Sequence, residues 1–396
     1  MNTLRKIYCR AFQKAFKFAL PFLPYRNPEV IGSVKSLPEI LLKKKCDNVL
    51  IITDKGIRNL GLTDRLERAL KGNNISYSIY DKTVANPTTV NVKEAEDLWY
   101  QSECKAIIGF GGGSSMDCAK AVAARIAKPH QSLAQMKGIL KVHKKLPLLI
   151  AIPTTAGTGS ETTLAAVITD AETRYKYAIN DFPLIPRYAV LDPKVTLSLP
   201  PFITATTGMD ALTHAIEGYI TKGAWEMSDM FHIKAIEIIS KSLRGAVENT
   251  PEGREGMALG QYVAGMGFSN VGLGLVHSMA HPLGALYDTP HGVANAIILP
   301  TVMEYNAPYT GEKYKDIAEA MGVDTTGMSQ EEYRKAAVDA VKQLSKDVGI
   351  PADLKEIVKE EDLQFLSESA LADACCPGNP RDTSVEEIKE LYKSLL

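Results

Sequence analysis

Histidines and one aspartate gather in two short segments in the second half of the chain. Three of its seven histidines, His277, His281 and His291, lie within fifteen positions, and Asp210 and His214 stand four apart about sixty residues earlier. Residues four apart share one face of a helix, so we expect each spaced pair to lie one turn apart on one face. Imidazole and carboxylate are common ligands of divalent transition metals. Two facing helices, with His291 on the loop that follows, could surround one ion.

A structural explanation stands beside this one. An isolated histidine on an apolar helix is usually an ordinary core residue. Here, however, four or five polar groups come together in segments rich in glycine and alanine. Burying that many rings without partners would cost several kcal/mol. The pattern therefore favours a metal site.

Short β-branched runs alternate with amphipathic segments in the first half of the chain, which predicts βαβ units around a parallel sheet. After a break rich in proline and aspartate at 191–201, the chain is expected to be mainly helical. The expected strands are 48–53, 76–80, 106–109 and 148–152, with helices at 64–71, 92–101 and 116–126. A hairpin is expected at 166–179, and later helices at 227–243, 333–348 and 385–395.

Three glycines, Gly111, Gly112 and Gly113, follow the third expected strand and precede Ser114 and Ser115, where a helix would begin. Glycine lets backbone N–H groups approach an anion closely, and a helix N-terminus is a ready phosphate site. The loop departs from the G-x-G-x-x-G dinucleotide pattern, so a purely structural turn is an open alternative.

Two further features indicate a nucleotide. Asp54, at the end of the first expected strand, could accept hydrogen bonds from ribose hydroxyls and repel a 2′-phosphate, which favours NAD over NADP. A plain turn-forming role is its alternative. The loop at 153–161, after the fourth strand, combines hydroxyls with permissive glycines that could wrap a polar ligand.

Together these segments resemble the iron-containing (group III) alcohol dehydrogenase family, from about Asn27 to the C-terminus. The resemblance implies an α/β fold of the dehydroquinate synthase-like kind. It would have an N-terminal Rossmann-like nucleotide-binding domain at 27–197 and a C-terminal all-helical metal-binding domain at 198–396. Asp210, His214, His277 and His291 match the family's metal ligands. His281 is similar to the family's additional histidine, which lies between metal and nicotinamide, and we expect it to relay a proton in catalysis.

The resemblance also implies the cofactors and the pocket. NAD is expected, with Fe(II) as the metal, although Zn(II) or another divalent metal would suit the same ligands. The residues implied for the cofactor are Asp54, Gly111, Gly112, Gly113, Ser114, Thr154, Thr155, Thr158 and Lys176. Those implied for the substrate pocket are Asn86, Leu164, Ala165, Val167, Phe268 and Cys375.

The expected reaction is a reversible hydride transfer between a small primary alcohol or diol and NAD, with the metal as Lewis acid at the oxygen. No basic cluster accompanies the metal motif, so the substrate is expected to be uncharged. Two alternatives remain on the same scaffold. One is a hydroxyacid–oxoacid transhydrogenase, and the other is a lyase similar to dehydroquinate synthase.

Composition limits the partners. The 396 residues are 45% hydrophobic with a net charge of −1, which gives no electrostatic support for nucleic-acid binding. Six scattered cysteines fit a reducing cytoplasm, and no apolar run reaches the length of a transmembrane segment. A homo-oligomer, most simply a dimer, is expected from the family. Residues 1–26 form a basic amphipathic extension that could pack on its own fold, on a dimer partner or on a membrane surface.

Overall fold

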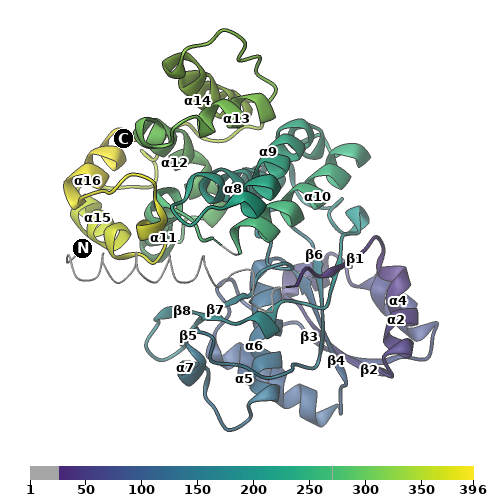
Figure 1. Ribbon diagram of the computed structural model, residues 1–396. Coiled ribbons are helices and arrows are strands. Elements are labelled where there is room, and N and C mark those ends of the chain that lie inside the picture. Colours follow the sequence, from purple (N-terminus) through teal and green to yellow (C-terminus); the bar gives the residue numbers. More distant parts are fainter. Residues whose placement is uncertain (1–25, 270) are drawn as a thin grey trace. The chain divides into compact units, whose positions relative to one another are not determined.

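The computed structural model describes residues 26–269 and 271–396, so almost all of the expected N-terminal extension lies outside the described residues. The described chain divides into two compact units (Figure 1). We call the first, which ends at Leu199, the α/β unit, and the second, which begins at Pro200, the helical unit.

A six-stranded parallel sheet, in the order β1-β9-β6-β4-β2-β3, forms the centre of the α/β unit. The four strands expected from the sequence are present. Two short strands at one edge, β1 and β9, were not predicted. The strands are β1 (Glu29–Ile31), β2 (Asn48–Ile52), β3 (Ser76–Tyr80), β4 (Ala106–Gly111), β6 (Leu148–Pro153) and β9 (Tyr188–Val190).

Both faces of this sheet are buried, which explains why its strands read as continuous apolar runs. Leu50 and Ile52 of β2 join a core under α5 (Thr89–Gln101) and α6 (Gly113–Ala127). The alternate residues Val49 and Ile51 join the core on the other side, with side chains of α2 (Leu37–Lys43) and α4 (Asp64–Lys71). The period-2 alternation of a strand therefore supplies two cores at once.

A three-stranded sheet, in the order β5-β8-β7, follows α7 (Leu133–Met136). Its strands are β5 (Gly138–Ile139), β7 (Ala165–Thr169) and β8 (Lys176–Asn180). β7 and β8 are antiparallel, as the expected hairpin requires. Asp170 closes the turn, because its Oδ1 accepts hydrogen bonds from the backbone N–H groups of Glu172 (3.0 Å) and Thr173 (2.9 Å).

Helices and short 3-10 turns are the regular elements described from Pro200 onward. α8 is buried along most of its length, and it packs against α9, α10 and α12. The helices of this unit are α8 (Pro201–Ile220), α9 (Glu226–Val247), α10 (Pro251–Phe268), α11 (Leu275–Tyr287), α12 (His291–Asn306), α13 (Lys313–Ala320), α14 (Gln330–Asp347), α15 (Leu363–Ala372) and α16 (Val385–Lys393).

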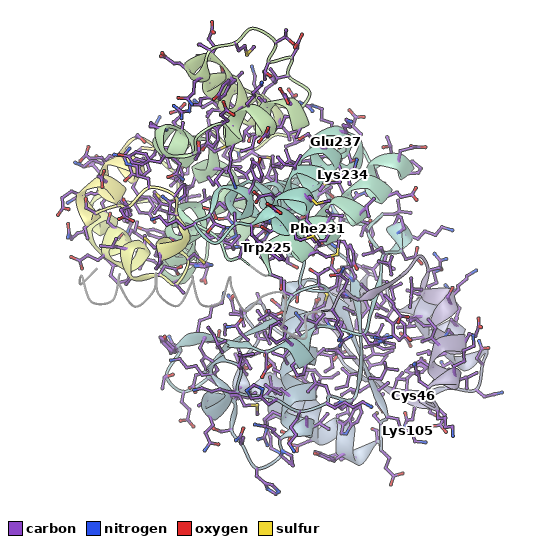
Figure 2. The ribbon with its side chains drawn as sticks, in the orientation of Figure 1. Cys46, Lys105, Trp225, Phe231, Lys234 and Glu237 are labelled. Carbon is purple, nitrogen blue, oxygen red and sulfur yellow. The ribbon has the colours of Figure 1, made fainter. Side chains whose placement is uncertain are left out.

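α9 is buried on one side only, and its outer face carries charged side chains together with the exposed Met227 and Met230. Lys234 and Glu237 form an ion pair there at 2.9 Å (Figure 2). Among residues 26–269 and 271–396, no helix combines the length and the apolar character that crossing a membrane requires.

Candidate metal and cofactor sites

The two spaced pairs lie on two helices of the helical unit. α8 carries Asp210 and His214 one turn apart, and α11 carries His277 and His281 in the same way. His291 was expected on a loop, which is wrong, because it is the first residue of α12. Pro290 precedes it, and the fixed φ of proline (−56° here) suits a residue at the start of a helix.

The side chains of the predicted ligands converge. Asp210 Oδ1 lies 3.8 Å from His277 Nε2 and 3.7 Å from His291 Nε2, and one ligand atom from each of the three falls within 4.8 Å of the others. The ring of His214 lies 4.6 Å from that of His277, between centroids, and stacks on Phe268 at 4.3 Å. All four predicted ligands therefore belong to one cluster, with the predicted pocket residue Phe268 against it.

Asn295 shows how closely the lone pairs of this cluster converge. It lies one helical turn after His291, and its Nδ2 is 2.7 Å from Asp210 Oδ1, 3.2 Å from His277 Nε2 and 3.0 Å from His291 Nε2. One small donor can thus reach three acceptors that the sequence assigned to a metal. Imidazole and carboxylate donors in this arrangement fit a borderline divalent cation such as Fe(II) or Zn(II). Sequence reasoning missed Asn295, although its spacing from His291 was a usable signal.

Glu217 contacts the Nδ1 edge of the His277 ring, opposite the edge that carries the candidate ligand atom. Its Oε2 lies 2.6 Å from His277 Nδ1, and its Oε1 accepts the backbone N–H of Val276 at 2.6 Å. A Cβ at Gly274 would stand 2.9 Å from Oε1, so only glycine lets the backbone approach this closely. When Glu217 is ionised it can only accept, so the contact then places the proton on Nδ1 and leaves Nε2 as the candidate ligand atom.

Burial and neighbouring charge set the protonation of the cluster. Burial opposes ionisation of Asp210, but the facing His214, His291 and His277 together lower the pKa of its carboxyl. Burial, reinforced by His214 and His291, puts the pKa of His277 well below its usual value, so this ring is neutral. Burial also raises the pKa of Glu217 to about 7. A neutral His277 ring beside an ionised Asp210 is the protonation state that a metal needs.

His281 lies beside this cluster without joining its closest triad. Its ring stacks on His291, with centroids 5.5 Å apart and planes at 12°. Its Nδ1 lies 2.8 Å from Asp373 Oδ2. The predicted pocket residue Cys375 is adjacent, and its backbone N–H donates to Asp373 Oδ1 at 2.8 Å. Burial raises the pKa of the Cys375 thiol well above its usual value.

The glycine loop lies in the α/β unit at the end of β4, where α6 begins at Gly113. Among the described residues, no side chain caps this helix, whose N-cap is Gly112, as expected for a helix start that holds an anion. Gly111 has φ +150°, and a Cβ there would lie 2.6 Å from Ser115 Oγ. Asp54 caps α3 (Lys55–Asn59) through Oδ1, and its Oδ2 lies 3.5 Å from Ser115 Oγ.

The second predicted cofactor loop packs against the first. A Cβ added to Gly112 would meet Thr155 at 3.6 Å, and one added to Gly113 would meet Thr158 at 3.2 Å. Thr154 N–H donates to the carbonyl of Gly111 at 3.0 Å. The structure thus brings Thr154, Thr155 and Thr158 to the glycine loop, as a shared ligand would need.

Lys120, which sequence reasoning missed, fastens α6 to the segment after this loop. It is fully buried, and its Nζ donates to Ser160 Oγ (3.0 Å), Thr163 Oγ1 (2.8 Å) and the carbonyl of Ala165 (2.8 Å). Burial lowers the pKa of Lys120 to about 8. Asp117, one turn earlier, accepts from Ser160 Oγ at 2.7 Å and from the Val167 N–H at 3.0 Å.

Predicted cofactor and pocket residues also meet near Asn86. Lys176 Nζ donates to Asn86 Oδ1 at 2.8 Å, and the backbone N–H of Asn86 donates to Ser114 Oγ at 3.3 Å. Leu164 and the β7 residues Ala165 and Val167 belong to the same unit. The predicted pocket residues therefore come from both units, with Phe268 and Cys375 in the helical unit.

Both halves of the chain match models of known families. Residues 30–193 match the model described as iron-containing alcohol dehydrogenase. Residues 204–396 match the C-terminal model of the Fe-containing alcohol dehydrogenase family.

Whole-chain comparisons agree with these matches. The chain is 49% identical over 363 residues to lactaldehyde reductase of Escherichia coli (strain K12), covering 91% of this chain and 95% of the relative. It is 37% identical over 378 residues to NAD-dependent methanol dehydrogenase of Bacillus methanolicus, covering 95% and 99%. The crystal structure of a 1,3-propanediol oxidoreductase matches with a TM-score of 0.91 at 38% identity, covering 94% of this chain and 99% of that one. The structural match confirms the expected fold class.

Proposed function

Because the chain belongs to the iron-containing alcohol dehydrogenase family, we propose that it is a metal- and NAD-dependent alcohol dehydrogenase that interconverts small primary alcohols or diols and their aldehydes. Family membership confirms the resemblance noted from the sequence. Oxidoreductase chemistry on an alcohol is the function that the relatives support, and they do not favour the transhydrogenase or lyase alternatives.

The observation that carries the proposal is the convergence of Asp210, His277 and His291, with His214 against them, next to the base His281. We propose Asp210, His214, His277 and His291 as ligands of Fe(II), with Zn(II) as the main substitute. A divalent metal held there supplies Lewis acidity at the oxygen of the alcohol or aldehyde, and NAD supplies the hydride acceptor.

For the cofactor, we propose that the N–H groups at the start of α6 hold the NAD diphosphate, together with Gly111, Gly112, Gly113 and Ser114. Asp54 is proposed to accept hydrogen bonds from a ribose, which favours NAD over NADP. Lys176 and the hydroxyls of the second loop complete the proposed cofactor set, which includes Thr154, Thr155 and Thr158.

His281 is proposed as the proton relay. Its side chain is 38% exposed, so it can exchange protons with solvent, and it lies against the ligand His291. An imidazole nitrogen can take the proton that the alcohol hydroxyl loses and pass it on to water. In the reverse direction the same nitrogen returns a proton to the product oxygen.

The substrate class is proposed as small and uncharged. The 49% identity to a lactaldehyde reductase favours a 2-hydroxyaldehyde and the corresponding 1,2-diol over simple alcohols. We propose that the pocket includes Asn86, Leu164, Ala165, Val167, Phe268 and Cys375. We propose that the protein forms a homodimer. We also propose a cytoplasmic location, because the free thiols of the described cysteines fit a reducing compartment.

The test is anaerobic turnover after the metal has been removed with a chelator and Fe(II) or Zn(II) has been added back. Oxidation would be followed by NADH formation with ethanol, butan-1-ol, propane-1,2-diol and propane-1,3-diol, and reduction with lactaldehyde. Asp210→Asn should lose metal and activity together. The matched control is Asp347→Asn, an acid that pairs with Arg244 at the surface, and it should keep both.

We expect activity to return with metal and to be highest with the 1,2-diol and lactaldehyde. Metal-dependent activity with another alcohol as the best substrate would overturn the substrate class only. NAD binding without turnover of any alcohol or aldehyde at any metal would overturn the proposed function.

A further inference from the structure

Asp373 contacts the proposed proton relay His281 and has no role of its own in the proposed mechanism. It follows α15, 92 residues from His281 in the chain, and its Oδ2 lies 2.8 Å from His281 Nδ1. The two helices that bring them together, α11 and α15, pack directly against one another. The contact is therefore built by the tertiary fold, since local sequence spacing cannot produce it.

The carboxylate of Asp373 is itself fixed in place. Its Oδ1 accepts the backbone N–H of Cys375 at 2.8 Å, which leaves Oδ2 to face His281. Its side chain is 19% exposed, half the exposure of the His281 side chain, which is 38%. A carboxylate held by its own backbone turn and mostly shielded from water is suited to orient a ring that must not rotate.

The geometry also selects a tautomer. An ionised carboxylate can only accept, so a neutral His281 ring beside it must carry its proton on Nδ1. The lone pair then lies on Nε2, at the opposite side of the ring. Stacking on His291 fixes the plane of the ring, and the hydrogen bond from Nδ1 fixes which edge points away from Asp373.

We propose that Asp373 is a positioning residue that holds His281 in the Nδ1–H tautomer, with Nε2 directed away from the carboxylate to exchange the substrate proton. The inference rests on the proposed function only for the role of His281. The hydrogen bond and the tautomer can be tested without any turnover.

A second explanation of the same side chains is a metal site. One ligand atom each from His281, Asp373 and Cys375 falls within 4.8 Å of the others. The Nδ1–carboxylate hydrogen bond accounts for the approach of His281 and Asp373, and a side-chain hydrogen bond between Cys375 and Asp373 accounts for the approach of the thiol. The positioning role therefore explains the cluster better, and metal stoichiometry is part of the test.

The first experiment is spectroscopic. Metal-free full-length protein would be labelled with ¹⁵N-histidine, and the His281 ring signals would be assigned by their loss in His281→Gln. We expect protonated Nδ1 and unprotonated Nε2 in the wild type, and loss of that preference in Asp373→Ala. An Nε2–H tautomer in the wild type, or spectra unchanged by the substitution, would overturn the proposal.

The second experiment is a double-mutant cycle on the metal-loaded enzyme. Asp373→Ala should lower kcat by about 10- to 100-fold with little change in KM, NAD affinity or metal content. In the His281→Gln background Asp373→Ala should hardly change kcat, because its effect acts through His281. An equal loss in both backgrounds, or a second bound metal equivalent that disappears in Asp373→Ala, would refute the positioning role.

Controls separate positioning from folding. Asp373→Asn keeps the size and an acceptor oxygen for the Cys375 N–H, so it should fold even if Asp373→Ala does not. Its amide N–H would then face His281 Nδ1 and favour the wrong tautomer, so its loss of kcat should be at least as large. Asp362→Asn removes another carboxylate at the same pair of helices, where Asp362 accepts from the Tyr287 hydroxyl at 2.6 Å, and should leave kcat unchanged. Full activity in His281→Gln would overturn the proposed relay role of His281. The tautomer measurement would still show whether Asp373 accepts a hydrogen bond from His281 Nδ1.

Discussion

At the proposed metal-ligand cluster, the orientation of His277 depends on Glu217, a carboxylate outside the proposed ligand set. Glu217 accepts from the His277 ring and from the backbone N–H of Val276, so it fixes both the side chain and the start of α11. Both residues are almost fully buried. The hydrogen bond at Nδ1 therefore fixes the direction of Nε2, the proposed ligand atom of His277.

We predict that Glu217→Gln weakens metal binding by about 10- to 100-fold, because an amide can offer an N–H to Nδ1 and favour the wrong tautomer. The measurement is competition for Zn(II) against a chromophoric chelator, with circular dichroism of the metal-free protein to verify folding. Glu304→Gln on α12, which removes an exposed ion pair with Lys342, is the matched control. Equal affinities for both variants would contradict this role of Glu217.

The spacing of the proposed ligand residues could be read from the sequence, but the contact that orients His281 could not. Asp210 with His214, and His277 with His281, repeat a spacing of four, and helical periodicity alone places such residues on one face. Asp373 carries no such signal, since it reaches His281 only through the packing of α11 on α15. Sequence periodicity describes one element at a time, so contacts between elements stay hidden.

Among the elements, prediction worked where the apolar run was long enough. The buried strands β2, β3, β4 and β6 were all expected, whereas β1 and β9 have only three residues each and show no readable pattern. The start of α12 was also misplaced, since His291 was expected on a loop. Asp288 ends α11 in the left-handed conformation, with φ 52°, and Pro290 restarts the chain as a helix at His291.

The junction between β4 and α6 gives a prediction about the cofactor. Gly111 has φ +150°, and a Cβ there would lie 2.6 Å from Ser115 Oγ and 2.8 Å from Ser115 Cβ. Gly111→Ala should therefore strain the loop by about 1–3 kcal/mol and weaken NAD binding by about 10-fold or more. The measurement is the Kd for NAD from fluorescence titration of the metal-free protein.

Gly32→Ala is the control for that loop, because a Cβ at Gly32 meets nothing within 4 Å. It lies in the same unit and should leave the Kd for NAD unchanged. Wild-type affinity for NAD in Gly111→Ala would show that the glycine loop does not contact the cofactor. The loop would then be a purely structural turn.

At the scale of the whole molecule, the two compact units separate the proposed chemistry. The α/β unit contains the proposed cofactor residues, and the helical unit contains the proposed metal ligands with His281. Each unit also contains one of the two tryptophans. Trp99 lies on α5, and Trp225, which Figure 2 labels, lies just before α9. Unfolding of the two units can therefore be followed separately.

Acid should destabilise the helical unit through His232 of α9. Burial, with smaller contributions from Lys313 and His214, lowers the pKa of this ring to about 3. Among the described residues, neither ring nitrogen has a hydrogen-bond partner, and the ring fits only because Gly218 and Gly267 have no Cβ. The unfolded chain binds a proton near pH 6.5, so it takes up more protons than the folded chain between about pH 3 and 6.5.

The free energy of unfolding should consequently fall as the pH drops through that window, with His232 contributing about 2 kcal/mol of loss between about pH 7 and pH 5. The measurement is urea denaturation of metal-free protein in a Trp99→Phe background, so that Trp225 reports the helical unit alone.

His232→Leu has no titrating group at this position and should flatten the pH dependence by that amount, whatever its effect on stability at pH 7. His143→Gln removes a histidine whose side chain is 63% exposed, and should keep the wild-type slope. The same slope in His232→Leu and wild type would mean that the acid sensitivity of this unit comes from another buried histidine, first of all the proposed ligand His277.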